Sequence, residues 1–289
     1  MPATVERFPA TADPHILHQH LLASGIVILE GAATRSTLDR ILTETGASPQ
    51  QPSQPGTTTA TTFGLAARSA TFATELLMHP VFTDLAQRML TDTAIIYYER
   101  ERTVSIAEPQ VSVTQMLCAS PGAAAWGLRR QDECHHIAHP AKRESDLGIL
   151  YAGTDVTREN GAVRVVVGSN RWDDLRDPVP EEEVLVELRK GDAVLWLGST
   201  YFGRAANTTT DETSILLGAT VTPGYLRQEE NQYLAVPWEG VAERYPTAVQ
   251  RFLGYYVSRP YGGAVEHMEP LDFLKVKGDW SKYIPVDLI

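Results

Sequence analysis

The sequence of 289 residues predicts one mainly β domain with helical decoration, a double-stranded β-helix of the jelly-roll, cupin-like type. Short apolar or alternating runs, rich in β-branched and aromatic residues, recur from about residue 94 onward. Turn signals such as Asn160-Gly161 separate these runs, because Asn and Gly tolerate a positive φ. We therefore expect a mostly helical part over about 1–93, a core jelly roll over about 94–223 and a C-terminal extension over about 224–289.

The first part is dominated by helix signals. Asp13 precedes Pro14 at the start of an apolar pattern with helical spacing, and it suits the N-cap position. The segments that follow are expected to be a short buried strand over 25–29, an amphipathic helix over 34–45, a loop or lid rich in Pro, Gln, Thr and Gly over 48–62, and a further helix over about 71–90.

The second part is expected to hold about eight short strands, which suit the two sheets of a jelly roll. The strand signals lie at 95–98, 111–117, 147–152, 153–157, 163–167, 193–197 and 215–221. A helix signal returns near 246–252. The linkers between these elements are short, so one domain is expected.

Composition excludes several classes of protein. An apolar content of 43% with 21% charged residues is typical of an ordinary globular chain. The formal net charge of −11 argues against a nucleic-acid binder and gives no attraction to anionic lipid. Two cysteines, Cys118 and Cys134, are too few for a disulfide framework and are expected to be small buried residues. Without a signal peptide or a long apolar run, a soluble cytoplasmic protein is expected.

Two segments carry a resemblance to a known family. Residues 155–169 (DVTRENGAVRVVVGS) resemble the central hairpin of phytanoyl-CoA-hydroxylase-like oxygenases, which depend on Fe(II) and 2-oxoglutarate. Residues 225–233 (YLRQEENQY) resemble the branch of that family found in fungal meroterpenoid and indole-alkaloid pathways. The resemblance implies a jelly roll, secondary metabolism and a small hydrophobic polycyclic substrate.

The resemblance also implies where the family's iron ligands would lie. The family needs two imidazoles and one carboxylate, arranged as His-any-Asp on one strand with a distal His after a later strand. The first pair falls on Arg129 and Gln131, and the distal position falls on Phe202. A guanidinium has no lone pair to donate, an amide offers only a neutral oxygen, and a phenyl ring offers no donor.

The cosubstrate anchor is missing as well. The family places an arginine about eleven positions after the distal His, where this chain has Thr213 or Ser214. The bidentate clamp on the 2-oxoglutarate carboxylate is therefore lost. We expect no bound metal and no cofactor, because binding of both Fe(II) and 2-oxoglutarate is predicted to be lost.

Other candidate ligands do not rescue the site. Asp132 lies one position out of register, which would turn it to the opposite face of a strand. His135 and His136 are common in this branch alongside the true ligands, so these two and His139 are expected to be structural. His15, His18 and His20 are expected on a solvated helix face, because no carboxylate follows them.

Charged residues near the former site lead to two hypotheses. Arg129 could pair with Asp132 and fill the cavity together with Phe202 and Arg204, which would make a pseudoenzyme. It could instead polarise a substrate carbonyl in place of the metal, which would make a redox-neutral isomerase or cyclase. The bulk of these side chains and the lack of an evident acid–base pair favour the first hypothesis.

The expected function is therefore that of a catalytically degenerate homologue that associates with an active oxygenase of the same family, as a heterodimer, and supports its oxidation of a fungal metabolite. A homodimer and the metal-independent isomerase remain the alternatives. The stretch from Tyr233 through Trp238 to Tyr256 and the loop over 48–62 are expected to supply the interface. Asp211 and Glu212 are expected in an exposed turn, with Arg204 as a candidate partner.

Overall fold

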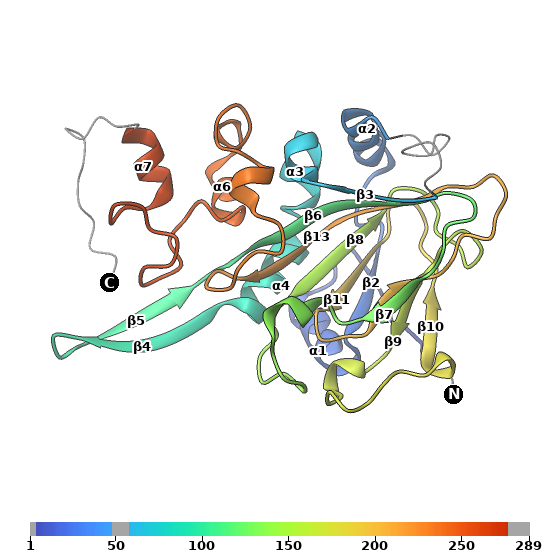
Figure 1. The fold of residues 1–289 in the computed structure, drawn as a ribbon, viewed down its shortest axis with the longest axis horizontal. Coiled ribbons are helices and arrows are strands. Elements are labelled where there is room, and N and C mark those ends of the chain that lie inside the picture. Colours follow the sequence, from blue (N-terminus) through green and yellow to red (C-terminus); the bar gives the residue numbers. More distant parts are fainter. Residues whose placement is uncertain (1–3, 48–57, 277–289) are drawn as a thin grey trace.

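The computed structural model describes residues 4–47 and 58–276 as two facing β-sheets with helices on one side (Figure 1). The larger sheet has seven strands in the order β1 (Arg7–Pro9), β2 (Ile26–Glu30), β11 (Ala193–Leu197), β8 (Leu147–Ala152), β13 (Ser214–Pro223), β6 (Pro109–Ala119) and β3 (Thr59–Phe63). The smaller sheet has four strands in the order β10 (Glu183–Val186), β9 (Val163–Val166), β12 (Phe202–Arg204) and β7 (Trp126–Arg129). The expected jelly roll is confirmed.

The central strands of the larger sheet are buried on both faces. In β11, Val194 and Trp196 point into the core between the two sheets, while the alternating residues Ala193, Leu195 and Leu197 pack against the helices. Strands β8 and β13 divide their side chains between the same two cores. This two-sided burial explains why the strands are continuous apolar runs in the sequence.

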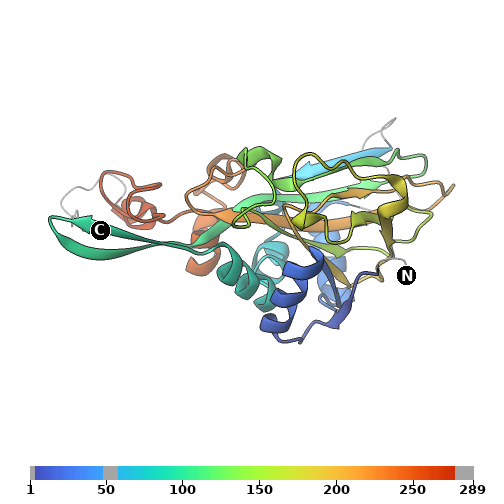
Figure 2. The same ribbon diagram turned by 90° about the horizontal axis from the view of Figure 1, so that it is seen from below.

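The helices cover the outer face of the larger sheet, and Figure 2 shows the blue and cyan helices on one side of the strands. Their bounds are α1 (Pro14–Ser24), α2 (Arg35–Thr45), α3 (Leu65–Arg68), α4 (Pro80–Leu90), α5 (Gln232–Ala235), α6 (Thr247–Phe252) and α7 (Pro270–Val276). The Asp13 side chain caps α1 by accepting a hydrogen bond from the His15 amide at 2.8 Å, as expected. No helix in the described ranges is long and apolar enough to cross a membrane.

Several local expectations are corrected. The helix expected over 71–90 is divided into a π-helical turn, Phe72–Leu76, and α4, which begins at Pro80 because proline suits the first turn of a helix. The segment 153–157 is no strand and makes only one β-bridge, between Val156 and Leu188. The loop expected over 48–62 ends earlier, because β3 pairs with the edge of β6. Residues 48–57 lie outside the described part of the chain.

The strand signal near 95–98 also has an unexpected place. It forms β4 (Asp92–Tyr98), which pairs with β5 (Glu101–Ala107) in a separate two-stranded sheet, and we call this hairpin the ribbon. Figures 1 and 2 show the ribbon extending away from the two main sheets. Its two-residue turn places Glu99 and Arg100 at positive φ (46° and 77°), a backbone that matches the strand twist but that usually takes Asn-Gly.

Candidate active site

The positions onto which the family's iron ligands were mapped meet at one cavity between the two sheets. Arg129 ends β7 and pairs in register with Phe202 at the start of β12, and Gln131 begins the 3₁₀ turn Gln131–His135. The cavity has a volume of about 420 Å³. It is lined by Thr61, Phe63, Gln115, Leu117, Trp126, Gly127, Arg129, Gln131, Leu150, Trp196, Phe202, Gly203 and Glu229.

The side chains at these three positions have other partners. The Phe202 ring stacks on Trp196, with the ring centroids 4.5 Å apart and the planes 10° apart. The Gln131 Nε2 amide donates a hydrogen bond to Glu229 Oε2 at 2.5 Å. Arg129 is exposed to solvent, so it does not fill the cavity. The expectation that bulky side chains fill the former site is therefore wrong.

Glu229 is the pocket residue that the sequence reasoning missed. It comes from the segment between β13 and α5, and its carboxylate reaches the Gln131 side chain from 98 positions away in the sequence. Although this side chain is open to solvent at the cavity mouth, the surrounding protein desolvates it and raises its pKa, while Arg129 and Gln131 oppose this shift. Residues 225–233 carried the family resemblance but gave no signal of this role.

The donor set does not fit a ferrous ion. The three mapped positions hold the exposed guanidinium of Arg129, the amide of Gln131, which is hydrogen-bonded to Glu229, and the stacked ring of Phe202. They supply no imidazole and no carboxylate, which are the ligands that the family's iron needs. Among residues 4–47 and 58–276, no group of three or more His, Cys, Asp or Glu side chains is arranged to hold a metal. These residues therefore do not fit Fe(II), whereas the Glu229 carboxylate beside them can accept a hydrogen bond or a proton.

The position of the cosubstrate anchor is occupied by a structural contact. Ser214 is buried; its Oγ accepts a hydrogen bond from Arg204 Nη2 at 2.7 Å and donates one to the Asn160 carbonyl. Thr213 is half-buried and offers no positive charge. Neither residue can clamp a carboxylate in the manner of an arginine.

Arg204 is not a pocket residue, contrary to expectation, and it does not pair with Asp211 or Glu212. Its guanidinium donates to the carbonyls of Gly161, Leu117 and Ser214 at 3.1 to 3.2 Å. Burial lowers its pKa to about 10, so the group stays charged at neutral pH. Glu212 instead accepts a hydrogen bond from Asn160 Nδ2 at 3.0 Å. Arg204 therefore ties strands of both sheets together behind the cavity.

The comparison with known proteins shows to which family this chain belongs. The sequence profile of the phytanoyl-CoA dioxygenase (PhyH) family matches residues 22–213. The chain belongs to the PhyH family. Dioxygenase peniF of Penicillium patulum is 32% identical over 219 residues, which cover 73% of this chain and 71% of that protein. Dioxygenase cnsJ of Penicillium expansum is 30% identical over 294 residues, with 94% and 86% covered.

Solved structures agree on the fold. The α-ketoglutarate-dependent epimerase SnoN from nogalamycin biosynthesis matches with a TM-score of 0.55 at 18% identity, covering 78% of this chain and 90% of that one. The carbocyclase SnoK from the same biosynthesis matches with a TM-score of 0.51 at 17% identity, covering 81% and 91%. At this level of identity, the likeness concerns the fold of a PhyH protein alone.

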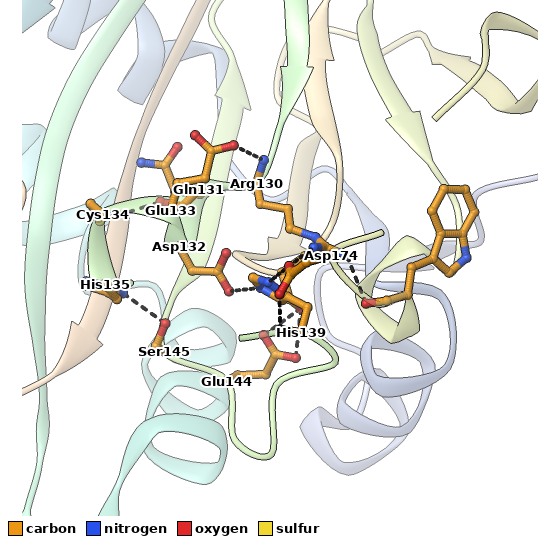
Figure 3. A network of polar contacts seen from close by, with 12 residues as sticks. Arg130, Gln131, Asp132, Glu133, Cys134, His135, His139, Glu144, Ser145 and Asp174 are labelled. Atoms are coloured by element: carbon orange, nitrogen blue, oxygen red, sulfur yellow. Dashed lines mark hydrogen bonds and ion pairs between the residues drawn. The ribbon is translucent and has the colours of Figure 1, made fainter. Parts of the chain in front are cut away.

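A buried polar network lies behind the turn Gln131–His135 of this PhyH chain (Figure 3). Asp132 is fully buried and meets His139 Nε2 at 3.1 Å, so it neither lines the cavity nor pairs with Arg129, contrary to expectation. The other ring nitrogen of His139 lies 2.7 Å from Asp174, which also binds Arg130 at 2.9 Å. The histidine expected to be structural thus bridges two carboxylates.

The other two histidines near this turn and the two cysteines differ in their surroundings. His135 Nδ1 lies 2.9 Å from Ser145 Oγ, whereas His136 is exposed and ends the turn at a positive φ of 53°. Cys118 is buried as expected. Cys134 is exposed, so that expectation was wrong for this residue.

Two further acids are buried beside Asp132. Glu144 accepts hydrogen bonds from Ser199 Oγ at 2.8 and 2.9 Å, and burial raises its pKa to about 7. Asp146 is fully buried, and desolvation, aided by Glu229 and Asp132, raises its pKa well above the usual range. The Thr220 hydroxyl lies beside it, but within the described residues neither carboxyl oxygen of Asp146 has a well-formed hydrogen bond. These acids are expected to hold protons in the folded protein.

This burial predicts that the free energy of unfolding falls as the pH rises. The folded protein keeps the Glu144 proton up to about pH 7, whereas the unfolded chain releases it near 4.5, so stability is lost across that window. Glu144→Gln keeps an acceptor for Ser199 and removes the titration. Relative to this variant, the native protein should lose up to about 3 kcal/mol between pH 4.5 and 7.5 in urea unfolding.

Glu181→Gln is the control, because Glu181 is exposed. It should leave the pH dependence of the free energy of unfolding unchanged. A pH dependence of Glu144→Gln that matches that of the native protein would contradict the assignment of Glu144.

Proposed function

We propose that this PhyH chain is a catalytically degenerate homologue that pairs with an active Fe(II)/2-oxoglutarate oxygenase and supports its oxidation of a fungal secondary metabolite. One observation carries the proposal. The fold around the former metal site is complete, whereas Arg129, Gln131 and Phe202 replace its three ligands and Thr213 replaces its anchor. The loss of four separate requirements supports the loss of the iron reaction rather than a tolerated change at one position.

The electrostatics of the cavity support the same conclusion. Ferrous iron is held by neutral imidazoles and an anionic carboxylate, and each ligand compensates the loss of its hydration. Here a permanent cation, Arg129, lies on the strand that should supply two ligands. The Glu229 carboxylate is committed to the Gln131 amide and to the charge of Arg129. A divalent cation in this cavity would therefore be repelled by Arg129, and it would find only oxygen atoms as ligands.

The pairing part of the proposal concerns the surface of the molecule. The aromatic stretch expected to form the interface is partly internal, because Tyr256 is buried and its hydroxyl donates to the Glu108 carbonyl. Tyr233 and Leu234 stay exposed, at 41% and 78%. They are the residues of that stretch that can serve as apolar anchors for a partner.

The first prediction of this proposal is that the purified protein binds neither Fe(II) nor 2-oxoglutarate at this cavity. Metal analysis after anaerobic loading with Fe(II) should give far less than one iron per chain, and calorimetry should detect no binding of 2-oxoglutarate at micromolar affinity. Stoichiometric iron together with micromolar cosubstrate affinity would refute the proposal.

The triple variant Arg129→His, Gln131→Asp, Phe202→His refines this test. It should regain iron, because the ligand set is restored, but no turnover, because the arginine missing at Thr213 still leaves 2-oxoglutarate without its clamp.

A second prediction addresses the partner. Co-expression with the neighbouring oxygenase of the same pathway should raise that enzyme's turnover or its soluble yield, as measured by product formation per active subunit. Arg129→Ala should leave this support intact, because Arg129 lies in the unused cavity. An unchanged turnover and yield of every oxygenase of the pathway would count against a supporting role.

The open cavity favours a second candidate function, a redox-neutral isomerase or cyclase. Aromatic walls formed by Trp126, Trp196 and Phe202 suit a hydrophobic polycyclic substrate. At the mouth of the cavity, Glu229 can accept and return a proton, and desolvation raises its pKa above the usual range of a glutamate, which favours that role. Arg129 can polarise a substrate carbonyl from the same side.

The third prediction separates this candidate from the first function. If the chain alone converts a pathway intermediate without iron, Glu229→Gln should lower kcat by at least ~100-fold, because proton transfer is lost while the hydrogen bond to Gln131 can persist. Glu230→Gln, one residue along, is the control and should retain activity. Equal activity of all three proteins would exclude Glu229 from the chemistry.

A further inference from the structure

A second cavity lies in the C-terminal part of the chain, and we call it the C-terminal cavity. Its volume is about 520 Å³, compared with about 420 Å³ for the cavity between the two sheets. Its walls come from two segments, 224–233 after β13 and 254–263 after α6, together with Gln110 near the start of β6. In the described part of the chain, no residue lines both cavities, so the two are separate sites.

Hydrogen bonds hold the walls of the C-terminal cavity in place. Gln110 Nε2 donates to the Leu226 carbonyl at 2.9 Å. Gln228 Nε2 donates to the carbonyls of Val111 and Leu253 at 2.8 and 3.0 Å. Both side-chain amides thereby fix the wall segments to each other or to β6. A site that is formed in advance binds a ligand with a smaller loss of conformational freedom.

Three tyrosine rings supply apolar surface to the C-terminal cavity. The Tyr256 side chain is buried, and its hydroxyl donates to the Glu108 carbonyl. The Tyr233 hydroxyl donates to the Gly254 carbonyl at 2.6 Å. Because backbone carbonyls accept from both hydroxyls, these two rings are fixed. Tyr225 is 53% exposed and adds a third ring that an apolar ligand can contact.

The charged side chains that line the C-terminal cavity are cations. They are Arg227 and Arg259, and within the described residues no Asp or Glu lines this cavity. Arg227 is exposed, and no acid of residues 4–47 or 58–276 lies within ion-pair distance of its guanidinium. Because the chain as a whole carries −11, this cavity is a local positive site that attracts an anion.

Two acids lie close to the C-terminal cavity without lining it. Burial raises the pKa of Tyr256, and the charges of Glu108 and Glu269 raise it further. Glu108 Oε2 accepts a hydrogen bond from Arg251 at 3.1 Å. Glu269 Oε2 accepts one from the Val257 amide at 2.8 Å. Both acids therefore have partners of their own outside the cavity walls.

Ser258 adds a hydroxyl group that lacks a partner. This residue lines the C-terminal cavity and is only 3% exposed. Its Oγ is buried, and among the described residues no group forms a hydrogen bond with it. Buried polar groups in proteins nearly always have a partner. An oxygen atom of a ligand in the cavity would supply the partner that Ser258 lacks.

We propose that the C-terminal cavity binds a small organic acid, with its carboxylate on Arg227 and its apolar ring system against the tyrosines. A guanidinium forms two parallel hydrogen bonds with a carboxylate. An inorganic anion would leave the three rings without a contact, and a volume of about 520 Å³ suits a small molecule. This inference goes beyond the proposed function and does not depend on it, because the positions mapped to the iron ligands take no part.

Calorimetry of the full chain with 2-naphthoate, a carboxylate on an apolar double ring, tests the proposal. The native protein should bind about one 2-naphthoate per chain with a Kd on the order of 10–100 µM. Inorganic phosphate at about 5 mM should show no binding, because it has no ring to contact the tyrosines. A native protein that does not bind 2-naphthoate at about 1 mM, or that binds phosphate as tightly, would overturn the proposal.

Variants of Arg227 test the contact with the carboxylate. Arg227→Gln should raise the Kd for 2-naphthoate about 10- to 100-fold, because charge-assisted hydrogen bonds are lost. Arg227→Lys should recover only part of the affinity, because an ammonium cannot form the two parallel bonds. Ser258→Ala should raise the Kd about 3- to 10-fold. Thermal melting checks that each variant is folded.

Arg189→Gln is the matched control, because Arg189 is exposed and lies outside the C-terminal cavity. It should leave the Kd for 2-naphthoate unchanged. An equal Kd for the native protein and for folded Arg227→Gln would contradict the proposed contact.

Arg129→Gln shows which cavity holds 2-naphthoate, because Arg129 lines the cavity between the two sheets. This variant should bind 2-naphthoate like the native protein. Weaker binding by Arg129→Gln, together with native affinity of Arg227→Gln, would place the ligand between the sheets and overturn the proposal. Neither result bears on the binding of Fe(II) and 2-oxoglutarate, so the proposed function keeps its own test.

Discussion

The structure depends on the burial of the larger sheet on both of its faces. Val194 and Trp196 of β11 point to the smaller sheet, and the residues between them point to the helices. Each central strand thereby contributes side chains to two cores. The loss of either core would expose one face of the same strands to water. The stacked pair of Trp196 and Phe202 belongs to this framework and also forms a wall of the cavity. The cavity at the positions mapped to the family's iron ligands is therefore part of the packing of the two sheets.

The sequence predicted the elements whose packing is complete within the chain. Strands buried on both faces appear as apolar runs, which is why β8, β11 and β13 were found near their true bounds. The strand predictions that failed depended on whether a segment finds a neighbouring strand to pair with. The threonine-rich β3 is a strand because it meets the edge of β6, and 153–157 is not one despite its β-branched residues. The ribbon carried a genuine strand signal, but nothing local indicated that it leaves the body.

The geometry of the site was predictable only where residues of a single segment determine it. Arg129 and Gln131 are near neighbours, so their meeting follows from local geometry once the family pattern is recognised. Glu229 reaches the cavity through a contact between distant segments, which no local pattern reveals. Arg204 was expected to seek a carboxylate, yet three backbone carbonyls and Ser214 Oγ satisfy most of its donors. Buried backbone carbonyls can take the place of acidic side chains as hydrogen-bond acceptors for a guanidinium. The sequence does not show how many such carbonyls lie near a given arginine.

The replacements at the cavity make sense together as a change in charge balance. A metal site keeps an anionic ligand beside its cation, and losing the cation alone would leave that carboxylate uncompensated. In this chain the carboxylate position holds neutral Gln131, while Arg129 introduces a positive charge that acts on Glu229. The cavity thus carries one cation and one acid within the protein and needs no metal to balance them. The proposed loss of iron chemistry requires such a balance, because a site without the metal must compensate its own charges.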